Sequence, residues 1–438
     1  MRKPGRPKKI KFQSPKGMHD LLSNDLRYYE KIFDVSQKIA SDYSFKRIET
    51  PILEQAELFL KGIGISTEVI EKQMYILKTR AKDILALRPE YTASIARSYI
   101  EKGMNNLSKP VKLWAFGPCF RYEKPQAGRF RQFWHLDFEV LGEKNAAIDA
   151  QIIQLFFNIL ASLKLKKLTV QINSIGCQKC RGYYRKFLIR YLKSNQSDLC
   201  PDCKIRLKTN PLRILDCKEP KCRLVINEGP QILDYLCKNC RAHFKEVLEF
   251  LDDLKINYEL SPFLVRGLDY YTNTVFEIFY SGDIVEESKE SEWSGIALVG
   301  GGRYDNLIKI LGGRDTAGCG AAAGVERIVQ LMKNNNFQLL EVRKPQIFLA
   351  QIGADSKRKA MVLFEEFRKA NIPIFEAFGN DSLRIQLAKA NRLQAKYALI
   401  LGEKEAIENE IIIRNMETGA QNSVKLEKIV EIMNKKIK

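Results

Sequence analysis

A segment near residue 320 restricts the fold more than any other part of the sequence. In "AGCGAAAGVERIVQLM", residues 317–332, the small residues Gly318, Gly320, Ala322 and Gly324 occupy every second position. Because successive side chains of a strand point to opposite faces, this alternation leaves one strand face almost bare. A flat ring can lie against the backbone of such a face. The segment therefore predicts a strand that offers its uncovered side to a ligand.

The residues that follow this strand predict a helix. Its apolar residues recur at helical spacing: Val325, Ile328, Val329 and Met332. Arg327 falls in the first helical turn, away from this apolar stripe. The helix dipole disfavours a cation there, so we expect an anionic or aromatic partner for Arg327. The alternative is tight strand–helix packing with Arg327 in solvent.

Two aromatic-rich segments predict an antiparallel hairpin. They are "VKLWAFGPCFRYE" and "FRQFWHLDFEVLG", joined by the basic loop "KPQAGR". Arg121 and Glu123 are two positions apart and share a face, and the second strand carries Phe133. An Arg for a phosphate, a carboxylate for the adenine amine and an aromatic ring for the base would form an ATP site. The sequence has no G-x-x-x-x-G-K-[ST] motif, so a nucleotide would be held without a P-loop.

The ends of the chain differ from this central region. Residues 1–11 hold six Lys/Arg and predict a disordered basic tail; their "KPGRPKK" also resembles an AT-hook that binds the DNA minor groove. Residues 24–41 predict a helix capped by Asn24, and a strand follows that Pro51 interrupts. Beyond residue 344, short apolar strands alternate with helical stretches, which is typical of a small α/β domain.

Eight of the ten cysteines lie between residues 177 and 240. They form four pairs: Cys177/Cys180, Cys200/Cys203, Cys217/Cys222 and Cys237/Cys240. Two C-x2-C units complete a tetrahedral zinc site, so four pairs are enough for two zinc ions. We predict at least one structural Zn²⁺, held by Cys200, Cys203, Cys237 and Cys240. The alternative is a set of reduced thiols without metal, and Cys119 and Cys319 are expected to be core residues.

Charge and hydropathy limit the class of protein. Lys and Arg exceed Asp and Glu by 72 − 52 = 20, and a positive field of this size attracts nucleic acids. No apolar run approaches the ~20 residues of a membrane span, and the basic N-terminus lacks the apolar core of a secretory signal. We therefore expect a cytoplasmic protein with a nucleic-acid partner and no membrane contact.

These motifs together resemble the class II aminoacyl-tRNA synthetases. Pro51 in its strand, "FRYE…RQF" in the hairpin and "GCGAAAGVER" resemble motifs 1, 2 and 3 of that class. "RGLDYYTNTVFE" and "GGGRYD" resemble segments peculiar to histidyl-tRNA synthetases, as do "LRPEYTAS", "NSIGCQKCR" and "SLRIQLAKANRLQAKYALILG". The likeness covers about residues 12–435, in the order the family has them.

The resemblance implies a fold and a domain order. The fold is an α+β antiparallel-sheet class II catalytic core with a helical Cys-rich insertion and a C-terminal α/β anticodon-binding domain. The expected ranges are a tail at 1–11, a catalytic domain at 12–165 and 260–332, an insertion at 166–259, a linker at 333–343 and an anticodon-binding domain at 344–438. A homodimer is also implied, with the strand of Pro51 at its interface.

The resemblance further implies ATP-dependent ligation of L-histidine to tRNA(His) through a histidyl-adenylate. ATP would bind with Mg²⁺, and Arg121 and Arg266 would be the catalytic cations at its α-phosphate. Arg327 and Phe133 would lie on the two faces of the adenine, beside Glu123. Arg129 and Arg131, flanking the hairpin tip, would contact the tRNA acceptor stem.

The amino-acid site follows from the same resemblance. Glu90 and Tyr271 would contact the two imidazole nitrogens of histidine, and Glu139 its ammonium group. The full set of implied histidine-binding residues is Glu90, Thr92, His135, Glu139, Arg266, Tyr270 and Tyr271. Three positions depart from the family pattern: His135 stands where Gln is usual, Tyr91 where Gly is usual, and Ala321 where a larger residue is common.

Three alternatives remain on sequence grounds. His135 is either a ligand or a core histidine, and a protonated imidazole there would repel an ammonium group. Two other functions fit the same fold: a non-charging regulatory subunit of a histidine-biosynthetic enzyme, and an inactive nucleic-acid-binding protein. The retained Arg121, Arg266, Arg327 and Glu90 argue against an inactive protein.

Overall fold

A computed structural model describes residues 12–64, 67–124, 128–281, 297–339, 345–379 and 381–437. The chain divides into two compact units, Met1–Leu339 and Leu340–Lys438. The predicted tail at 1–11 lies outside the described residues, and so does the predicted linker from residue 340 onward. None of the described helices combines the length and the apolar character that crossing a lipid bilayer requires.

The larger unit is built on a sheet with the strand order β1-β5-β6-β11-β10-β9-β7-β8. Pairing is parallel between β1 and β5 and between β7 and β8, and antiparallel elsewhere. The strands are β1 (Lys46–Arg47), β5 (Val111–Phe120), β6 (Gln132–Leu141), β7 (Leu168–Ser174), β8 (Tyr258–Leu260), β9 (Thr272–Tyr280), β10 (Ala297–Arg303) and β11 (Gly318–Gly324). The predicted hairpin of β5 and β6 and the predicted strand β11 are confirmed.

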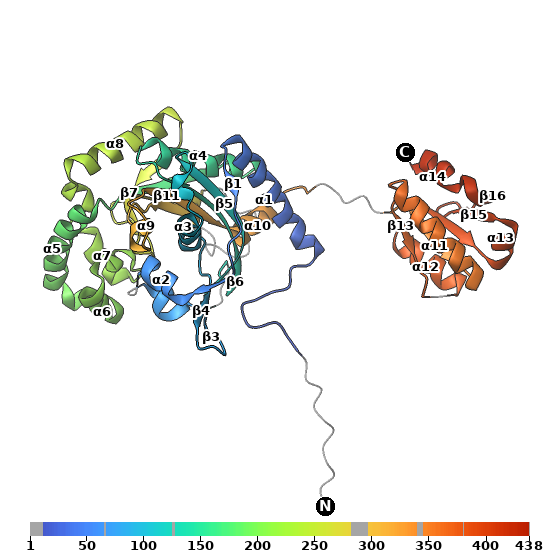
Figure 1. The fold of residues 1–438 in the computed structure, drawn as a ribbon, viewed down its shortest axis with the longest axis horizontal. Coiled ribbons are helices and arrows are strands. Elements are labelled where there is room, and N and C mark those ends of the chain that lie inside the picture. Colours follow the sequence, from blue (N-terminus) through green and yellow to red (C-terminus); the bar gives the residue numbers. More distant parts are fainter. Residues whose placement is uncertain are drawn as a thin grey trace, which may run out of the picture. The chain divides into compact units, whose positions relative to one another are not determined.

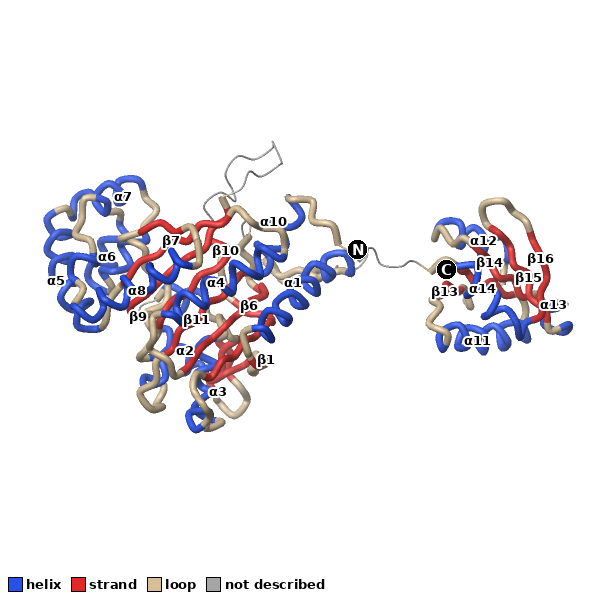
Figure 2. Tube along the Cα trace, turned by 90° about the horizontal axis from the view of Figure 1, so that it is seen from above, coloured by secondary structure: helices blue, strands red, loops and turns tan. Residues whose placement is uncertain are grey.

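Four helices cover one face of this sheet (Figure 2). They are α1 (Ser23–Asp42), α4 (Ala147–Ser162), α8 (Lys238–Asp253) and α10 (Val325–Asn334). The core between these helices and the sheet contains Trp114, Phe138 and Phe276, one each from β5, β6 and β9. Their side chains point to the helix-covered face of the sheet. The helix predicted at 24–41 is therefore confirmed, but its cap is not Asn24. Leu22 occupies the cap position, because its carbonyl accepts the first helical hydrogen bond, from Leu26.

The opposite face of the sheet carries shorter elements. A second sheet has the order β2-β4-β3, from Leu53–Gln55, Ile84–Leu87 and Ile76–Lys78. The helices α2 (Ala56–Ile63), α3 (Thr92–Glu101) and α9 (Leu307–Ile310) contact one another on this side. Pro51 separates β1 from β2, as the sequence predicts for an interrupted strand.

The Cys-rich segment is helical and follows β7. Its elements are α5 (Gln178–Ser194), η3 (Gln196–Asp198), α6 (Pro201–Thr209), η4 (Pro211–Asp216), α7 (Pro220–Asn227) and η5 (Ile232–Tyr235), and α8 follows. Figure 1 shows α5, α6 and α7 gathered beside β7. All of β7 and the first two residues of β8 fall within the range expected for the insertion, yet both strands pair into the main sheet. The helical insertion therefore begins at α5.

The smaller unit has a five-stranded sheet of order β13-β12-β14-β15-β16. The strands are β12 (Ile347–Gln351), β13 (Ile374–Glu376), β14 (Tyr397–Leu401), β15 (Glu410–Asn415) and β16 (Gln421–Lys425). Apolar residues of α11 (Ala354–Lys369) and α14 (Ile429–Ile437) pack on one face, and those of α12 (Leu383–Arg392) on the other. A shorter helix, α13 (Glu403–Glu408), precedes β15. This is the α/β architecture that the alternating pattern predicts.

Candidate functional site

The register of the main sheet places small residues on both sides of β6. His135 lies opposite Gly117 of β5 and Gly324 of β11, and Glu139 lies opposite Gly320. These residues share the sheet face opposite the four covering helices. We call it the site face, defined by His135, Asp137 and Glu139 of β6 and by Gly300, Gly302, Gly320, Ala322 and Gly324 of β10 and β11. The bare strand face predicted from sequence is thus confirmed.

Functional side chains occupy the space that the missing side chains leave. A Cβ on Gly300 would stand 2.1 Å from Nη2 of Arg266. A Cβ on Gly320 would stand 1.6 Å from Oε2 of Glu139. These glycines are therefore required by the close approach of a cation and of a carboxylate to the backbone.

Three arginines from distant parts of the sequence reach this face. Arg121 follows β5, donates from Nε to the carbonyl of Pro89 at 3.0 Å, and lies 5.4 Å from the ring centroid of Phe133. Arg266 forms an ion pair with Glu277 of β9. Arg327 lies in the first turn of α10, as predicted, and donates to the carbonyl of Ala297.

These cations lie within electrostatic range of one another. The pKa of Arg327 is lowered to about 10, first by burial and then by the positive charge of Arg129, with smaller effects from Arg121 and Arg266. Glu123 opposes this shift. A partly buried cluster of like charges is unfavourable without a counterion. The cluster therefore favours a ligand with several negative charges.

Three buried carboxyl groups lie next to the cations. Glu90, Asp137 and Glu139 are at most 2 % exposed, and burial raises the pKa of each. Glu90 accepts the backbone N–H of Thr92 at 2.6 Å, and Glu139 accepts the Thr92 hydroxyl at 2.5 Å. Tyr304 donates its hydroxyl to the other oxygen of Glu139. Such a group ionises readily when a cation binds, so this end of the site favours an ammonium group.

His135 lies between the acids and the arginines. Its side chain is 12 % exposed, and its Nδ1 lies 3.5 Å from Oδ2 of Asp137. Its pKa is lowered to about 3, first by burial and then by the positive charge of Arg121. The imidazole is therefore neutral at physiological pH, and the repulsion of an ammonium group that a protonated ring would cause does not arise.

Tyr270 and Tyr271 connect the two charged regions. Both side chains are buried, and their ring centroids are 4.6 Å apart. Arg266 lies 5.9 Å from the ring of Tyr271, and Tyr270 lies 5.7 Å from that of Tyr304. Burial raises the pKa of Tyr271 to about 12, so its hydroxyl keeps its proton and can act as a hydrogen-bond donor.

The structure adds three residues that the sequence interpretation missed. Asp137 lies between His135 and Glu139 on the site face, Glu277 pairs with Arg266, and Tyr304 binds Glu139. The period-2 pattern of "HLDFE" would have identified Asp137. Tyr304 and Glu277 lie in segments that the resemblance identified. The partner of Tyr304 comes from β6, whereas the partner of Glu277, Arg266, begins the same segment.

Tyr91 fits its position because position 117 lacks a side chain. A Cβ on Gly117 would stand 2.3 Å from the Tyr91 hydroxyl oxygen. The Tyr91 ring lies 4.0 Å from the guanidinium carbon of the buried Arg88. Arg88 also donates to the carbonyl oxygens of Pro118 and Thr50. The tyrosine thus belongs to the hydrogen-bonded network of Arg88.

The hairpin tip lies partly outside the described residues, at 125–127. Arg129 is exposed and lies 3.6 Å from the carboxylate of Glu123. Arg131 lies 3.8 Å from the ring centroid of Tyr122 and donates to the carbonyl of Glu123. Both residues predicted to contact tRNA therefore lie near Glu123. The negative charge of Glu123 also raises the pKa of Arg327.

The predicted cysteine set is wrong. Cys200 and Cys203 lie in one group and Cys237 and Cys240 in another, so these four cannot hold a single ion. The first cysteine group is Cys177, Cys180, Cys237 and Cys240, and the second is Cys200, Cys203, Cys217 and Cys222. Chain topology decides the pairing: α8 returns to the start of α5, whereas η4 and α7 close on the start of α6. Cys119 and Cys319 are buried, as predicted.

Comparisons with known proteins identify related chains. The family model described as "Histidyl-tRNA synthetase" matches residues 17–179 and 225–328, and "Anticodon binding domain" matches residues 346–436. The histidine–tRNA ligase of Thermodesulfovibrio yellowstonii is 39 % identical over 98 % of this chain and 99 % of its own. That of Halothermothrix orenii is 41 % identical over 97 % and 99 %. The apo S. aureus histidyl-tRNA synthetase matches with a TM-score of 0.75 and 31 % identity over 96 % and 99 %.

Proposed function

Because this chain belongs to the histidyl-tRNA synthetase family, we propose that it ligates L-histidine to tRNA(His) through a histidyl-adenylate. The observation that carries the proposal is the meeting of an arginine cluster and a buried acid cluster on one bare sheet face. ATP brings negative charge beyond what Glu123 and Glu277 supply to the arginines, and histidine brings the ammonium that the acids lack. With its ammonium group at the acids, the bound histidine would direct its carboxylate toward the arginines.

The first reaction step joins the histidine bound at the acids to the ATP bound at the arginines. A carboxylate oxygen of histidine forms a bond to the α-phosphorus of ATP, which enters as its Mg²⁺ complex. The bond from that phosphorus to the bridging oxygen breaks, and pyrophosphate leaves. Negative charge accumulates on the α-phosphate oxygens in the transition state, so Arg121 and Arg266 are assigned to stabilise it. The tRNA 3′ hydroxyl then displaces AMP from the adenylate.

The adenine and the triphosphate are assigned to the motif residues. Phe133 stacks on one side of the base and Arg327 lies on the other, near the γ-phosphate. Glu123 accepts from the adenine amine. The 5.4 Å separation of Arg121 from the Phe133 ring supports a base and an α-phosphate held side by side.

Histidine is assigned to the acid end. Glu90 and Tyr271 bind the imidazole nitrogens, and Glu139 with Thr92, Tyr270 and His135 surrounds the ammonium. Each oxygen of Glu90 already accepts a backbone N–H but retains a second lone pair. A ligand that lacks the imidazole leaves these buried groups unpaired, which is the basis of a discrimination of ~10⁴–10⁵.

The remaining partners follow from the charge and the smaller unit. We assign the anticodon side of tRNA(His) to residues 346–436 and the acceptor stem to Arg129 and Arg131. The exposed apolar residues Ile52, Leu53, Ile76 and Ile84 lie in or next to the small sheet near Pro51 and support a homodimer interface. None of the ten cysteines, all of them within the described residues, forms a disulfide, which fits a cytoplasmic location.

ATP–pyrophosphate exchange with each of the twenty amino acids tests the proposal. We expect exchange with histidine alone. Arg266→Ala should lower the exchange rate on the order of 10²–10³-fold, because it removes charge from the transition state. A loss under tenfold would refute the role of Arg266. Absence of histidine-dependent exchange in the folded wild-type protein would favour the regulatory-subunit or the inactive alternative.

A further inference from the structure

The two cysteine groups lie outside the proposed reaction site and have the geometry of single-metal sites. Within each group the four Sγ atoms lie within 4.8 Å of one another. The Sγ–Sγ distance is 3.6 Å for Cys177–Cys180 and 3.9 Å for Cys200–Cys217. A disulfide requires about 2.05 Å, whereas four sulfurs at ~2.3 Å from one tetrahedral ion stand about 3.8 Å apart. We propose that each group holds one structural Zn²⁺ ion.

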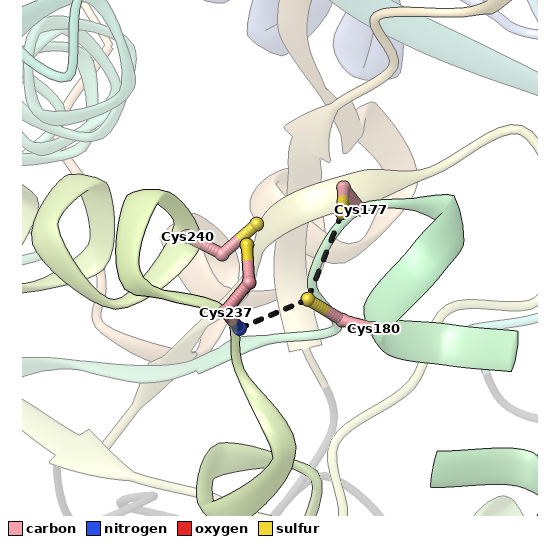
Figure 3. A group of neighbouring side chains, drawn as sticks. All are labelled: Cys177, Cys180, Cys237 and Cys240. Atoms are coloured by element: carbon pink, nitrogen blue, oxygen red, sulfur yellow. Dashed lines mark hydrogen bonds between the residues drawn. The ribbon is translucent and has the colours of Figure 1, made fainter. Parts of the chain in front are cut away.

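The backbone presents the cysteines as metal-binding turns do. Cys177, Cys200 and Cys237 each occupy the cap position of a helix, and the second cysteine of each C-x2-C pair lies in the first turn. Figure 3 shows the two pairs of the first group facing each other from the starts of α5 and α8. Backbone N–H groups also donate to the sulfurs: Cys237 to Cys180 and Cys200 to Cys222, each at 3.1 Å.

The donor set selects the kind of metal. Four sulfur ligands favour zinc or iron over Mg²⁺ or Ca²⁺, which prefer oxygen. Helix N-termini and N–H donors stabilise the thiolate form that zinc requires. Basic residues adjacent to the cysteines in sequence, such as Lys179, Arg181, Lys204 and Arg223, offset the net negative charge of a Zn–Cys₄ centre.

The first site supports the segment 266–273, which carries Arg266, Tyr270 and Tyr271. In the thiol form, Cys240 Sγ donates to Oδ1 of Asn273 at 3.2 Å, so α8 contacts this segment directly. Arg181, next to Cys180 in sequence, donates to the carbonyl of Tyr271 at 3.0 Å. A metal ion that joins α5 to α8 would therefore hold one end of this segment.

The second site supports the other end of the same segment. Cys217 directly follows η4, and this short helix and the residue before it reach the segment. Asn210 donates to the carboxylate of Asp269 at 3.1 Å, and Arg213 donates to the carbonyl of Arg266 at 3.2 Å. The two zinc ions would thus position the histidine-specific segment from both ends, an inference that rests on the proposed function.

Metal analysis of the full-length protein, purified without chelator, tests the sites independently of activity. We expect two zinc ions per chain and an X-ray absorption spectrum with four sulfurs at ~2.3 Å per zinc. Less than about 0.2 zinc per chain, nitrogen or oxygen ligands, or iron in place of zinc would overturn the proposal. Because the spectrum is taken on wild-type protein, this test does not depend on the folding of any variant.

Paired variants test the positioning role. Cys177→Ser/Cys180→Ser and Cys217→Ser/Cys222→Ser should each lose one zinc and keep the other. Each should raise KM for histidine or lower kcat in the exchange assay on the order of 10- to 100-fold, because the segment loses its alignment. Cys319→Ala, which removes a buried thiol from the opposite face of the sheet, should keep two zinc ions and activity within about twofold.

The outcomes separate this inference from the proposed function. Two zinc ions in a protein without histidine-dependent exchange would retain the sites and overturn the function. Histidine-dependent exchange in a zinc-free protein would retain the function and overturn the sites. Loss of one zinc with kinetics within twofold of wild type would overturn the positioning role.

Discussion

Arg266 and Glu277 form an ion pair on the site face, and the Arg266 guanidinium lies directly over Gly300. Both side chains are about one-fifth exposed, so the pair is accessible to a ligand. The carboxylate holds the cation against the sheet, where the phosphate of the proposed function would compete for it. The proposed catalytic cation is thus positioned by an acid from the next strand and by the absence of a side chain from another.

Gly300→Ala should displace Arg266 without unfolding the protein. The new Cβ would stand 2.1 Å from Nη2, and the far end of an Arg side chain can move aside. We expect a loss of about 10²-fold in histidine-dependent exchange, since a 1 Å misplacement has an effect of this size. Gly182→Ala is the matched control, because no atom lies within 4 Å of its Cβ position. Equal exchange rates for the two variants would contradict the assignment.

Gly320→Ala should affect stability as well as histidine binding. Its Cβ would stand 1.6 Å from the Glu139 carboxylate and 2.6 Å from the backbone oxygen of Phe138, neither of which can move freely. Overpacking of this kind costs roughly 1–3 kcal/mol, measurable by denaturant unfolding. KM for histidine should rise more than KM for ATP, because Glu139 lies at the acid end. A variant as stable as wild type with an unchanged KM would refute this account.

Glu326→Gln should change how stability depends on pH. Burial raises the pKa of Glu326 to about 7, so the folded state keeps a proton between pH 4.5 and 7 that the unfolded state releases. The contribution of protonated Glu326 to the free energy of unfolding is therefore fully present below pH 4.5, and it is lost as the pH rises through 7. The glutamine side-chain oxygen can still accept hydrogen bonds from the backbone N–H of Trp134 and from the Tyr29 hydroxyl.

The measurement is the difference in unfolding free energy between Glu326→Gln and wild type. The variant should gain roughly 2–3 kcal/mol relative to wild type between pH 5 and pH 8, because the Glu326 pKa of about 7 lies well above the unfolded value of 4.5. The exposed Glu30→Gln in α1 serves as the control and should show a constant difference over this range. A constant difference for Glu326→Gln would exclude the raised pKa.

His135→Ala should raise KM for histidine about tenfold, because a hydrogen bond to a charged group contributes roughly 1.5 kcal/mol or more. His135→Gln should restore most of this loss, since an amide oxygen can also accept from an ammonium. The ratio of the wild-type and His135→Gln KM values should be constant from pH 6 to 8, because the His135 pKa of about 3 lies far below this range. An unchanged KM in both variants would show that His135 does not contact the ligand.

Much of the site could be predicted because it is encoded locally. The alternation at Gly318–Gly324 determines which strand face is bare, and the register of β11 against β6 places this face beside His135 and Glu139. The separation of Arg121 from Phe133 follows from the hairpin alone. The partners of Arg266, Glu139 and Arg327 could not be predicted. Glu277 and Ala297 lie on β9 and β10 and Tyr304 directly follows β10, and the sequence does not state the order of these strands.

The cysteines likewise show one property that the sequence predicts and one that it does not. The C-x2-C spacing predicts pairs of thiols that face one metal ion, and the structure places three of these pairs at helix starts. Four pairs, however, can be combined two by two in three ways. The closure of α8 onto α5 selects one of them.

The sequence by itself determined the strand and helix pattern, the bare sheet face, the cysteine pairs and the set of charged residues. These features depend on residues that are close to one another in the sequence. Tertiary structure alone decided that His135 is neutral, that Arg266 pairs with Glu277, and which cysteines share a group. Burial and long-range contacts set these properties, and both come into existence only when distant segments pack together.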